Sequence, residues 1–540
     1  MRRGKSGHDD QDRDGQGQGE WQGGKAGRHG RTGSLFRGRP LAMMRGNNRA
    51  MVEVCSGMPC TTPHRKPLRR VAAALLAALW LLAVPVAPVS AGLFGGDEEA
   101  LGAQEHPKIL AQFGGEYRDA QVQAYVAGIG QRLAAVTERP EGPWTFTVLD
   151  SDVVNAFALP GGYVYITRGL LALAKDEAEV ASVVAHEMGH VTGQHSSQRQ
   201  TRSTIAELLS LGVGILLGSP ELAQLAGLGS SAVLAGYSRG QETDADRRGV
   251  AYLHRAGYDP FAMATFLETM RRYEQYQSLR AGQEEGGFSF FSTHPRTESR
   301  VEEAAVLARD LPGGVRPVEP YLAAVDNLIY GDSPENGFVR GQTFAHPALG
   351  LAFSVPAGFS LLNGTDQVIA KGPGGVAILF DGGRVGNVAS PVDYLTQVWG
   401  RGSPLSAVEP ITIDGLPAAT AVTRGEAGQE AVDLRLVAIR FDADSIYRFV
   451  FLAPVGTLGR YDRAFQETAN SFHRLTRQEA AGLQPRRIRV VAVRPGEAVE
   501  SLVARMPQEP YAEELFRIIN DIPPGTPLQP GQGVKIITGG

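Results

Sequence analysis

The chain has 540 residues, too many for one hydrophobic core, so about three folded units are expected. Hydrophobic residues make up 43% of it and charged residues 20%, which is typical of globular protein. The formal net charge of −4 is unevenly distributed, because residues 1–70 hold 15 basic and 6 acidic residues whereas residues 92–540 hold 38 and 51. A net charge of −13 on the expected folded part argues against nucleic acid as a partner.

An uncharged apolar run, Val71–Val84, follows a basic cluster and ends at Pro85. Small residues lead up to Ala91, so residues 65–91 have the order of a secretory signal peptide. The run is short for a bilayer core of roughly 30 Å, although an uncleaved membrane anchor is the alternative. We therefore expect a secreted protein whose mature form has no stable membrane span.

The only two cysteines, Cys55 and Cys60, lie upstream of this apolar run. Cleavage of the signal would leave no thiol for a disulfide, a metal site or a nucleophile. Residues 1–64 are rich in Gly, Arg, Gln and Asp. That composition predicts a disordered extension, or a stretch that precedes the true start of translation.

Helical and strand-like patterns alternate between residues 105 and 310, which predicts an α+β domain that is mostly helical. Asp176 is the expected N-cap of the helix that precedes the histidine motif. The strand over 163–167 is expected to be an edge strand that pairs with an extended peptide. The expected elements are, in order, a helix over 119–136, strands over 144–149 and 163–167, and helices over 176–190, 242–255, 260–279 and 297–308.

Two segments of this region allow more than one interpretation. The apolar, glycine-rich segment 203–235 predicts either two short packed helices or a flap over the active site that is mobile or faces a membrane. The segment 281–287 is a polar loop rich in Gly and Glu. Both flank the helices that carry the candidate site.

After Asp310 the pattern changes. Residues 311–320 predict a linker, and short β-like runs between Gly and Pro turns predict a separate β-rich domain over 336–475. No motif indicates the role of that domain. A last unit over 487–540 has the order strand, two short helices, strand.

The strongest chemical signal is the sequence HEMGH at His186–His190. On a helix, positions i and i+4 share a face, so both imidazoles can bind one ion at about 2.0–2.1 Å. Glu187 lies beside the pair, where it can accept a proton from the attacking water. Gly189 allows close approach of another backbone.

A catalytic zinc needs a third protein ligand, and Glu242, near the start of the next helix, is the leading candidate. Asp246 lies one turn later and can accept the N–H of a ligand histidine. His195 is the competing ligand, although it lies about 140° around a continuing helix from His190.

These residues resemble those of the M48 zinc peptidases of the secreted bacterial type. The resemblance covers roughly residues 105–308 and rests on HEMGH, VTGQH, YSRGQETDADRRGV and STHPRTESR in that order, with NAFALPGGYVYITRGLL upstream. It implies a zincin domain with one Zn²⁺ per chain, endopeptidase activity and a periplasmic quality-control role. It also implies that His186, His190 and Glu242 are the ligands, Glu187 the catalytic acid and base, and Asp246 their neighbour. Gln194 departs from the family pattern, which commonly has arginine there.

His294 and Arg300 are further candidates for the site. Pro295 restricts His294 to an extended backbone, so its ring can face the zinc from across the cleft. It can then stabilise the oxyanion of the tetrahedral intermediate together with Arg300, or it can occupy the open position of the zinc and hold the enzyme latent. The alternative is a surface histidine near a helix start.

The last unit resembles a LysM glycan-binding module through Pro495-Gly496-Glu497, Ile519-Asn520 and the Pro530-Gly531-Gln532 turn. The alternative is a βααβ cap that packs on the protease. We therefore expect a zinc endopeptidase of misfolded cell-envelope proteins, periplasmic and peripheral to membrane or cell wall, with peptidoglycan as a further candidate partner. The alternatives are a non-catalytic envelope chaperone, which would not need Glu187, and a cell-wall protein whose main role is glycan binding.

Overall fold

The computed structural model describes residues 95–195, 237–280, 294, 299–365, 367–385, 388–427 and 430–540. The predictions for residues 1–64, the signal peptide 65–91, and the segments 203–235 and 281–287 lie outside these residues. Within the described ranges, no helix combines the length and the apolar character that crossing a membrane requires.

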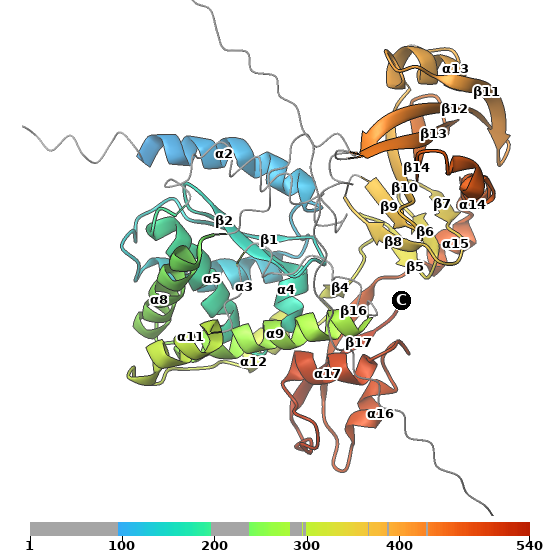
Figure 1. The fold of residues 1–540 in the computed structure, drawn as a ribbon. Coiled ribbons are helices and arrows are strands. Elements are labelled where there is room, and N and C mark those ends of the chain that lie inside the picture. Colours follow the sequence, from blue (N-terminus) through green and yellow to red (C-terminus); the bar gives the residue numbers. More distant parts are fainter. Residues whose placement is uncertain are drawn as a thin grey trace, which may run out of the picture. The chain divides into compact units, whose positions relative to one another are not determined.

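The fold is of the α+β class, and its first part packs helices around a small sheet (Figure 1). The metal-motif helix α5 contacts strands β2 and β3 on one side and helix α8 on the other. The elements of this part are α2 (Gly95–Gln112), α3 (Ala120–Ala134), β1 (Thr145–Leu149), β2 (Ala156–Leu159), β3 (Tyr163–Thr167), α4 (Arg168–Leu173), α5 (Glu177–Thr192), α8 (Arg239–Arg255), α9 (Ala262–Arg280), α11 (Arg300–Arg309) and α12 (Glu319–Val325).

The strand over 163–167 exists as predicted, but its predicted edge position is wrong. The strand order is β1-β3-β2, so β3 is central, parallel to β1 and antiparallel to β2. Among the described strands, β2 is the edge of this sheet that contacts α5 most, and its four residues are all buried. Alternation alone cannot distinguish a central strand from an edge strand, because both bury one face.

The helix that carries the histidines begins where the sequence predicts. Asp176 is its N-cap, and its Oδ1 accepts a hydrogen bond of 2.9 Å from the backbone N–H of Glu179. Arg316 donates to Asp176 and to Glu179, and the N–H of Glu177 bonds to the carbonyl of Pro317 at 2.9 Å. Residues of the predicted linker 311–320 therefore hold the start of α5 in place through hydrogen bonds.

Helices α5 and α8 cross so closely that their backbones are in contact. A Cβ on Gly189 would lie 2.9 Å from the carbonyl oxygen of Ala245, which is closer than carbon and oxygen pack. A Cβ on Gly249 would lie 3.2 Å from the backbone nitrogen of His186. Two glycines thus allow the crossing and bring the acidic residues of α8 next to the histidines of α5.

The β-rich region follows, as predicted, and contains two sheets. One has seven strands in the order β11-β12-β13-β14-β10-β9-β8, and the other has four in the order β15-β7-β6-β5. Phenylalanines from both sheets form its core, among them Phe353, Phe380 and Phe449. The strands are β5 (Phe338–Arg340), β6 (Thr343–His346), β7 (Leu351–Ser354), β8 (Ser360–Asn363), β9 (Gln367–Lys371), β10 (Ala377–Arg384), β11 (Ser406–Ile413), β12 (Leu416–Ala427), β13 (Glu430–Arg440), β14 (Ser445–Pro454) and β15 (His473–Arg474), and helix α14 (Leu458–Ser471) packs on β7, β13 and β14.

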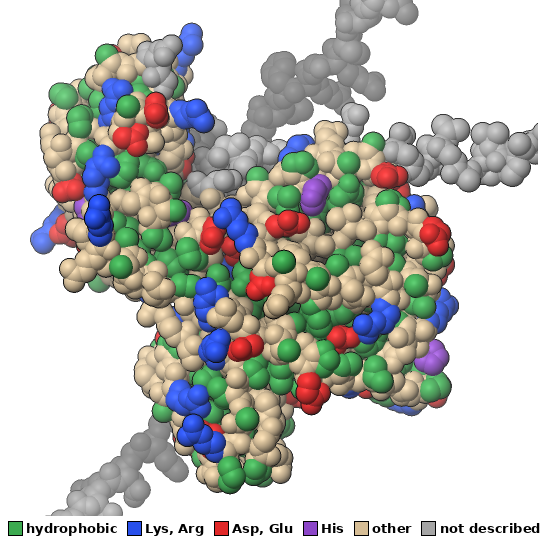
Figure 2. All heavy atoms as spheres, turned by 180° about the vertical axis from the view of Figure 1, so that it is seen from behind, with side chains coloured by type: hydrophobic (Ala, Val, Ile, Leu, Met, Phe, Trp, Pro, Cys, Tyr) green, Lys and Arg blue, Asp and Glu red, His purple; other side chains and the backbone are tan. Residues whose placement is uncertain are grey.

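The surface of the described residues mixes both signs of charge on the face that Figure 2 shows. Lysine and arginine side chains alternate there with aspartate and glutamate, and apolar side chains lie between them. The excess of acidic residues in the sequence is therefore not separated from the basic residues on this face.

The C-terminal unit has the predicted order of elements. Strands β16 (Arg486–Ala492) and β17 (Gly533–Thr538) form a sheet with β4 (Ile329–Tyr330), and helices α16 (Val499–Val503) and α17 (Ala512–Asn520) connect them. Its buried residues belong to the same hydrophobic cluster as those of α3, α5 and α9. The unit therefore packs on the helical domain, and its resemblance to LysM stays a prediction.

One buried lysine joins the two parts. Lys535 on β17 is 1% exposed, and its Nζ donates to the carbonyl oxygens of Ala172 and Ala174 at the end of α4 and to the hydroxyl of Tyr321. The carbonyls at a helix C-terminus carry partial negative charge, which suits a cation. Burial nevertheless lowers the pKa of Lys535 to about 7.

This pKa predicts a pH dependence of stability. The unfolded chain keeps the proton of Lys535 up to its ordinary pKa of 10.5, whereas the folded protein releases it near 7. Between these values the unfolded state binds more protons, so the free energy of unfolding should rise with pH. Thermal unfolding of wild type and Lys535→Met at about pH 7.5 and about pH 9.5 measures this, and the variant should show the flatter dependence.

Lys108→Met is the matched control, because the side chain of Lys108 is half exposed. This control should keep the wild-type pH dependence. Equal pH dependence in Lys535→Met and wild type would contradict the lowered pKa.

Candidate metal centre

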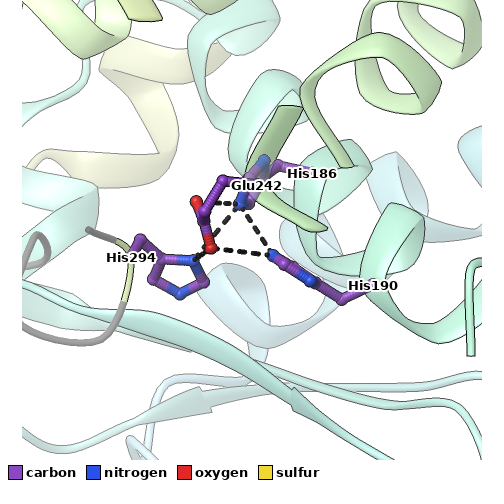
Figure 3. A group of neighbouring side chains, drawn as sticks. All are labelled: His186, His190, Glu242 and His294. Atoms are coloured by element: carbon purple, nitrogen blue, oxygen red, sulfur yellow. Dashed lines mark hydrogen bonds and ion pairs between the residues drawn. The ribbon is translucent and has the colours of Figure 1, made fainter. Parts of the chain in front are cut away.

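Four buried side chains meet at one point between α5 and α8 (Figure 3). His186 and His190 come from α5, one turn apart, and Glu242 comes from the first turn of α8. His294 approaches from the opposite side. Each is at most 2% exposed. All four were named as candidates from the sequence, and the fold places them side by side.

The distances between the donor atoms fit a tetrahedral ion. Nε2 of His186 lies 3.1 Å from Nε2 of His190, and Oε1 of Glu242 lies 3.4 Å from the latter atom. Nδ1 of His294 lies 3.2 Å from Nε2 of His186 and 3.1 Å from Oε1 of Glu242. Ligands about 2.0–2.1 Å from a zinc ion at a tetrahedron's centre are about 3.3–3.4 Å apart. Along these four pairs the donors are therefore spaced for one ion, and all four donor atoms lie within 4.8 Å of one another.

The donor set also suits zinc chemically. Imidazole nitrogens and a carboxylate oxygen are its usual ligands, and three imidazole nitrogens facing one another at this spacing are best satisfied by a shared cation. Burial alone would raise the pKa of Glu242, yet His294, His186 and His190 outweigh it and hold that pKa well below its usual range. The carboxylate is thus ionised, as a metal ligand must be.

Glu187 lies beside the ligands and not among them. It is fully buried on α5, and its Oε1 is 3.4 Å from Nε2 of His294. Burial raises the pKa of Glu187, because the ionised carboxylate is poorly solvated there. A carboxylate with a raised pKa is a stronger base, which suits a group that accepts a proton from water.

Asp246 and Arg300 support the ligands from behind. Asp246 Oδ1 lies 2.8 Å from Nδ1 of His186, which leaves Nε2 of that ring for the metal. Arg300, 2% exposed, donates to both oxygens of Asp246 at 2.8 Å and lies 2.8 Å from Oε2 of Glu242. Burial raises the pKa of Asp246, but Arg300 and His186 outweigh burial and hold it at about 2. The role of Arg300 at an oxyanion stays a prediction.

Two further residues flank His190. His195, the competing ligand, lies outside the group of four, with its Nδ1 2.9 Å from Nδ1 of His190. Tyr237 stacks on the His190 ring with the ring centroids 3.6 Å apart. Sequence reasoning misses Tyr237, although its position just before Ser238, the N-cap of α8, was a signal that it adjoins Glu242.

Comparison with known proteins bears on the region that holds this centre. Residues 120–308 match Peptidase family M48. All four clustered side chains, Glu187, Asp246 and Arg300 lie within the matched residues. The family that matches is therefore the one that the sequence motifs indicated.

Several curated relatives are similar over the same region. The beta-barrel assembly-enhancing protease of Yersinia pestis is 34% identical over 205 residues, which cover 36% of this chain and 40% of that protein. Its Escherichia coli (strain K12) counterpart is 32% identical over 202 residues, covering 36% and 40%. The mitochondrial metalloendopeptidase OMA1 of Schizosaccharomyces pombe is 29% identical over 210 residues, covering 38% and 59%. The chain thus spans about 40% of the length of these bacterial relatives.

The matched family and these relatives are named as peptidases, and the residues that match the family include the four clustered donors. Among solved structures, cyanobacterial PsbP from Synechocystis sp. PCC 6803 aligns over 26% of this chain and 98% of its own length, at a TM-score of 0.20 and 14% identity.

The donor geometry predicts one zinc ion per chain. His186→Ala and Glu242→Ala each remove a ligand, so both variants should lose the metal on dialysis, whereas wild type should retain it. Zinc measured by elemental analysis against protein concentration tests this. His254→Ala is the control, because His254 lies on α8 but outside the cluster. Full zinc occupancy in both ligand variants would overturn the assignment.

Proposed function

We propose that this protein is a secreted zinc endopeptidase that cleaves misfolded proteins of the cell envelope in the periplasm. The cluster of His186, His190, Glu242 and His294, with Glu187 beside it, is the observation that carries the proposal. The relatives named for β-barrel assembly support an envelope substrate, and the predicted signal peptide supports secretion.

The residues of the site divide the work of peptide hydrolysis. Zinc, when bound, polarises the scissile carbonyl and acidifies water. Glu187 accepts the proton of the attacking water and passes it to the leaving amine, for which its raised pKa suits it. Asp246 and Arg300 hold His186 and Glu242 in place, so that these two ligands need not move during the reaction.

The sheet edge formed by β2 among the described strands is the proposed docking site for the peptide. An extended substrate can add to a sheet edge through main-chain hydrogen bonds, which gives broad sequence tolerance. The carbonyl of Ala156 on β2 lies 3.3 Å from Nε2 of His294, so this edge adjoins the metal ligands. Because β3 is central, a proline at Ile166 would break the sheet itself and would not test docking.

The position of His294 favours the latent-state role over oxyanion stabilisation. Its Nδ1 is a fourth donor within 3.2 Å of His186 and Glu242, where a catalytic zinc keeps an open position. Its Nε2 faces Ala156 on the docking edge and Glu187. One ring would therefore block both the metal and the start of the peptide site, and we propose that it must leave before substrate binds.

The chemistry is tested with Glu187→Gln. Glutamine keeps the size of the side chain but cannot accept the proton, so cleavage of a casein-type substrate should fall roughly 10²-fold or more. Zinc content should stay at the wild-type level, because Glu187 is not a ligand. An active Glu187→Gln variant would show that another group is the base.

The latent state is tested with His294→Ala. If His294 blocks the metal, the variant should show higher basal proteolysis and faster loss of zinc to a chelator, because one donor is gone. If it instead serves the transition state, turnover should fall. His346→Ala, in the β-rich region, is the control for loss of a buried histidine. Wild-type turnover together with wild-type zinc loss would exclude both roles.

A further inference from the structure

The two histidine ligands of α5 are supported in different ways. His186 has a carboxylate, Asp246, 2.8 Å from its Nδ1. His190 has no carboxylate at that position and instead has the ring of His195, with the two Nδ1 atoms 2.9 Å apart. Behind His195, its Nε2 lies 3.3 Å from Oδ2 of Asp244 on α8. The imidazole of His195 thus lies between the proposed ligand His190 and the carboxylate of Asp244.

The positions of the protons follow from the metal site. Nε2 of His190 faces the other donors, so it must be free of hydrogen to bind a metal, and the neutral ring then carries its hydrogen on Nδ1. That hydrogen can be donated only if Nδ1 of His195 is the acceptor. Neutral His195 then carries its own hydrogen on Nε2 and donates it to Asp244. Each step fixes the tautomer of the next ring.

The backbone after α5 is shaped to hold this ring. The helix ends at Thr192, and Gln194 has φ +53°, which turns the chain back so that the N–H of His195 bonds to the carbonyl of His190 at 3.0 Å. A Cβ on Gly193 would lie 2.5 Å from Nε2 of His195, so only glycine fits. The reversal explains how a residue five positions after His190 contacts it.

Helix α8 holds the other side of His195. Gln241 donates to the carbonyl of His195 at 3.1 Å and also completes the capping box with Ser238. Asp244 in turn accepts from Arg248 at 2.7 Å, which fixes its orientation. His195 itself is 4% exposed, whereas the side chain of Asp244 is 21% exposed, so the outer end of this chain of contacts lies nearer the surface. Glu242, a ligand, and Asp244, the end of the relay, are two residues apart on this helix.

We propose that His195 is a positioning residue that holds His190 in its metal-binding tautomer and orientation, with Asp244 as its anchor. The proposal rests on the proposed zinc site. It excludes His195 as an alternative ligand, because both of its ring nitrogens face other partners and neither joins the group of four.

The test measures zinc affinity by chelator competition in the full chain, with no substrate present. His195→Phe keeps an aromatic ring but removes the acceptor, so the dissociation constant should rise about 10- to 100-fold, as is typical when the support of a ligand is lost. His195→Gln offers a side-chain carbonyl to His190 and an amide to Asp244, so its affinity should be closer to wild type than that of His195→Phe. His254→Phe is the matched control and should bind zinc as wild type does.

Coupling through one chain of contacts is tested with a double variant. Asp244→Asn should weaken zinc binding alone, yet add little in the His195→Phe background, because the path from Asp244 to His190 is already broken. The visible spectrum of the Co²⁺-loaded His195→Phe protein should show an unchanged number of ligands. Melting of the metal-free proteins reports folding separately, and if His195→Phe does not fold, Asp244→Asn and His195→Gln carry the test.

An unchanged zinc affinity in His195→Phe, or in Asp244→Asn should the former not fold, would overturn the proposal. So would a cobalt spectrum with one ligand fewer, which would make His195 a ligand. Wild-type protein that binds no zinc would instead overturn the proposed function, so the two failures are distinct.

Discussion

The close crossing of α5 and α8 is the constraint on which the site depends. Gly189 faces Ala245 and Gly249 faces the backbone of His186, so that no side chain separates the helices there. Because the two backbones touch, the carboxylates of Glu242 and Asp246 on α8 lie close to the histidine rings of α5. A larger residue at either glycine would force the helices apart, and the donor atoms, now 3.1–3.5 Å apart, would no longer surround one point.

Burying this many charged groups requires that each have a partner. Arg300 lies between Asp246 and Glu242 and offsets two carboxylates at once, and a divalent ion would offset what remains at Glu242. Glu187 is the member whose ionised form is least supported, which is why its pKa is raised. The arrangement that pairs the other charges therefore leaves Glu187 with a raised pKa, which suits its proposed role as the base.

The C-terminal unit belongs structurally to the helical domain that it follows by more than 150 residues. It shares a hydrophobic core with that domain, and Lys535 reaches the end of α4, which lies only three residues before α5. A binding module on a flexible tether would not need such contacts. The C-terminal strand thus contacts the segment that leads into α5, the helix of the proposed ligands His186 and His190.

The sequence by itself determined the parts whose signal is local. The i, i+4 spacing of His186 and His190, the N-cap at Asp176 and the order of elements in the C-terminal unit all follow from residues close together in the chain, and the structure has them. Glu242 and His294 could be named as candidates, since their neighbouring residues matched a family pattern, but their distances to the histidines could not be. Only the tertiary structure decided that β3 is central, that His195 turns back to support His190, and that Lys535 meets α4. Each of these depends on backbone packing between segments distant in sequence, and hydrophobic periodicity shows which face is buried but not what lies against it.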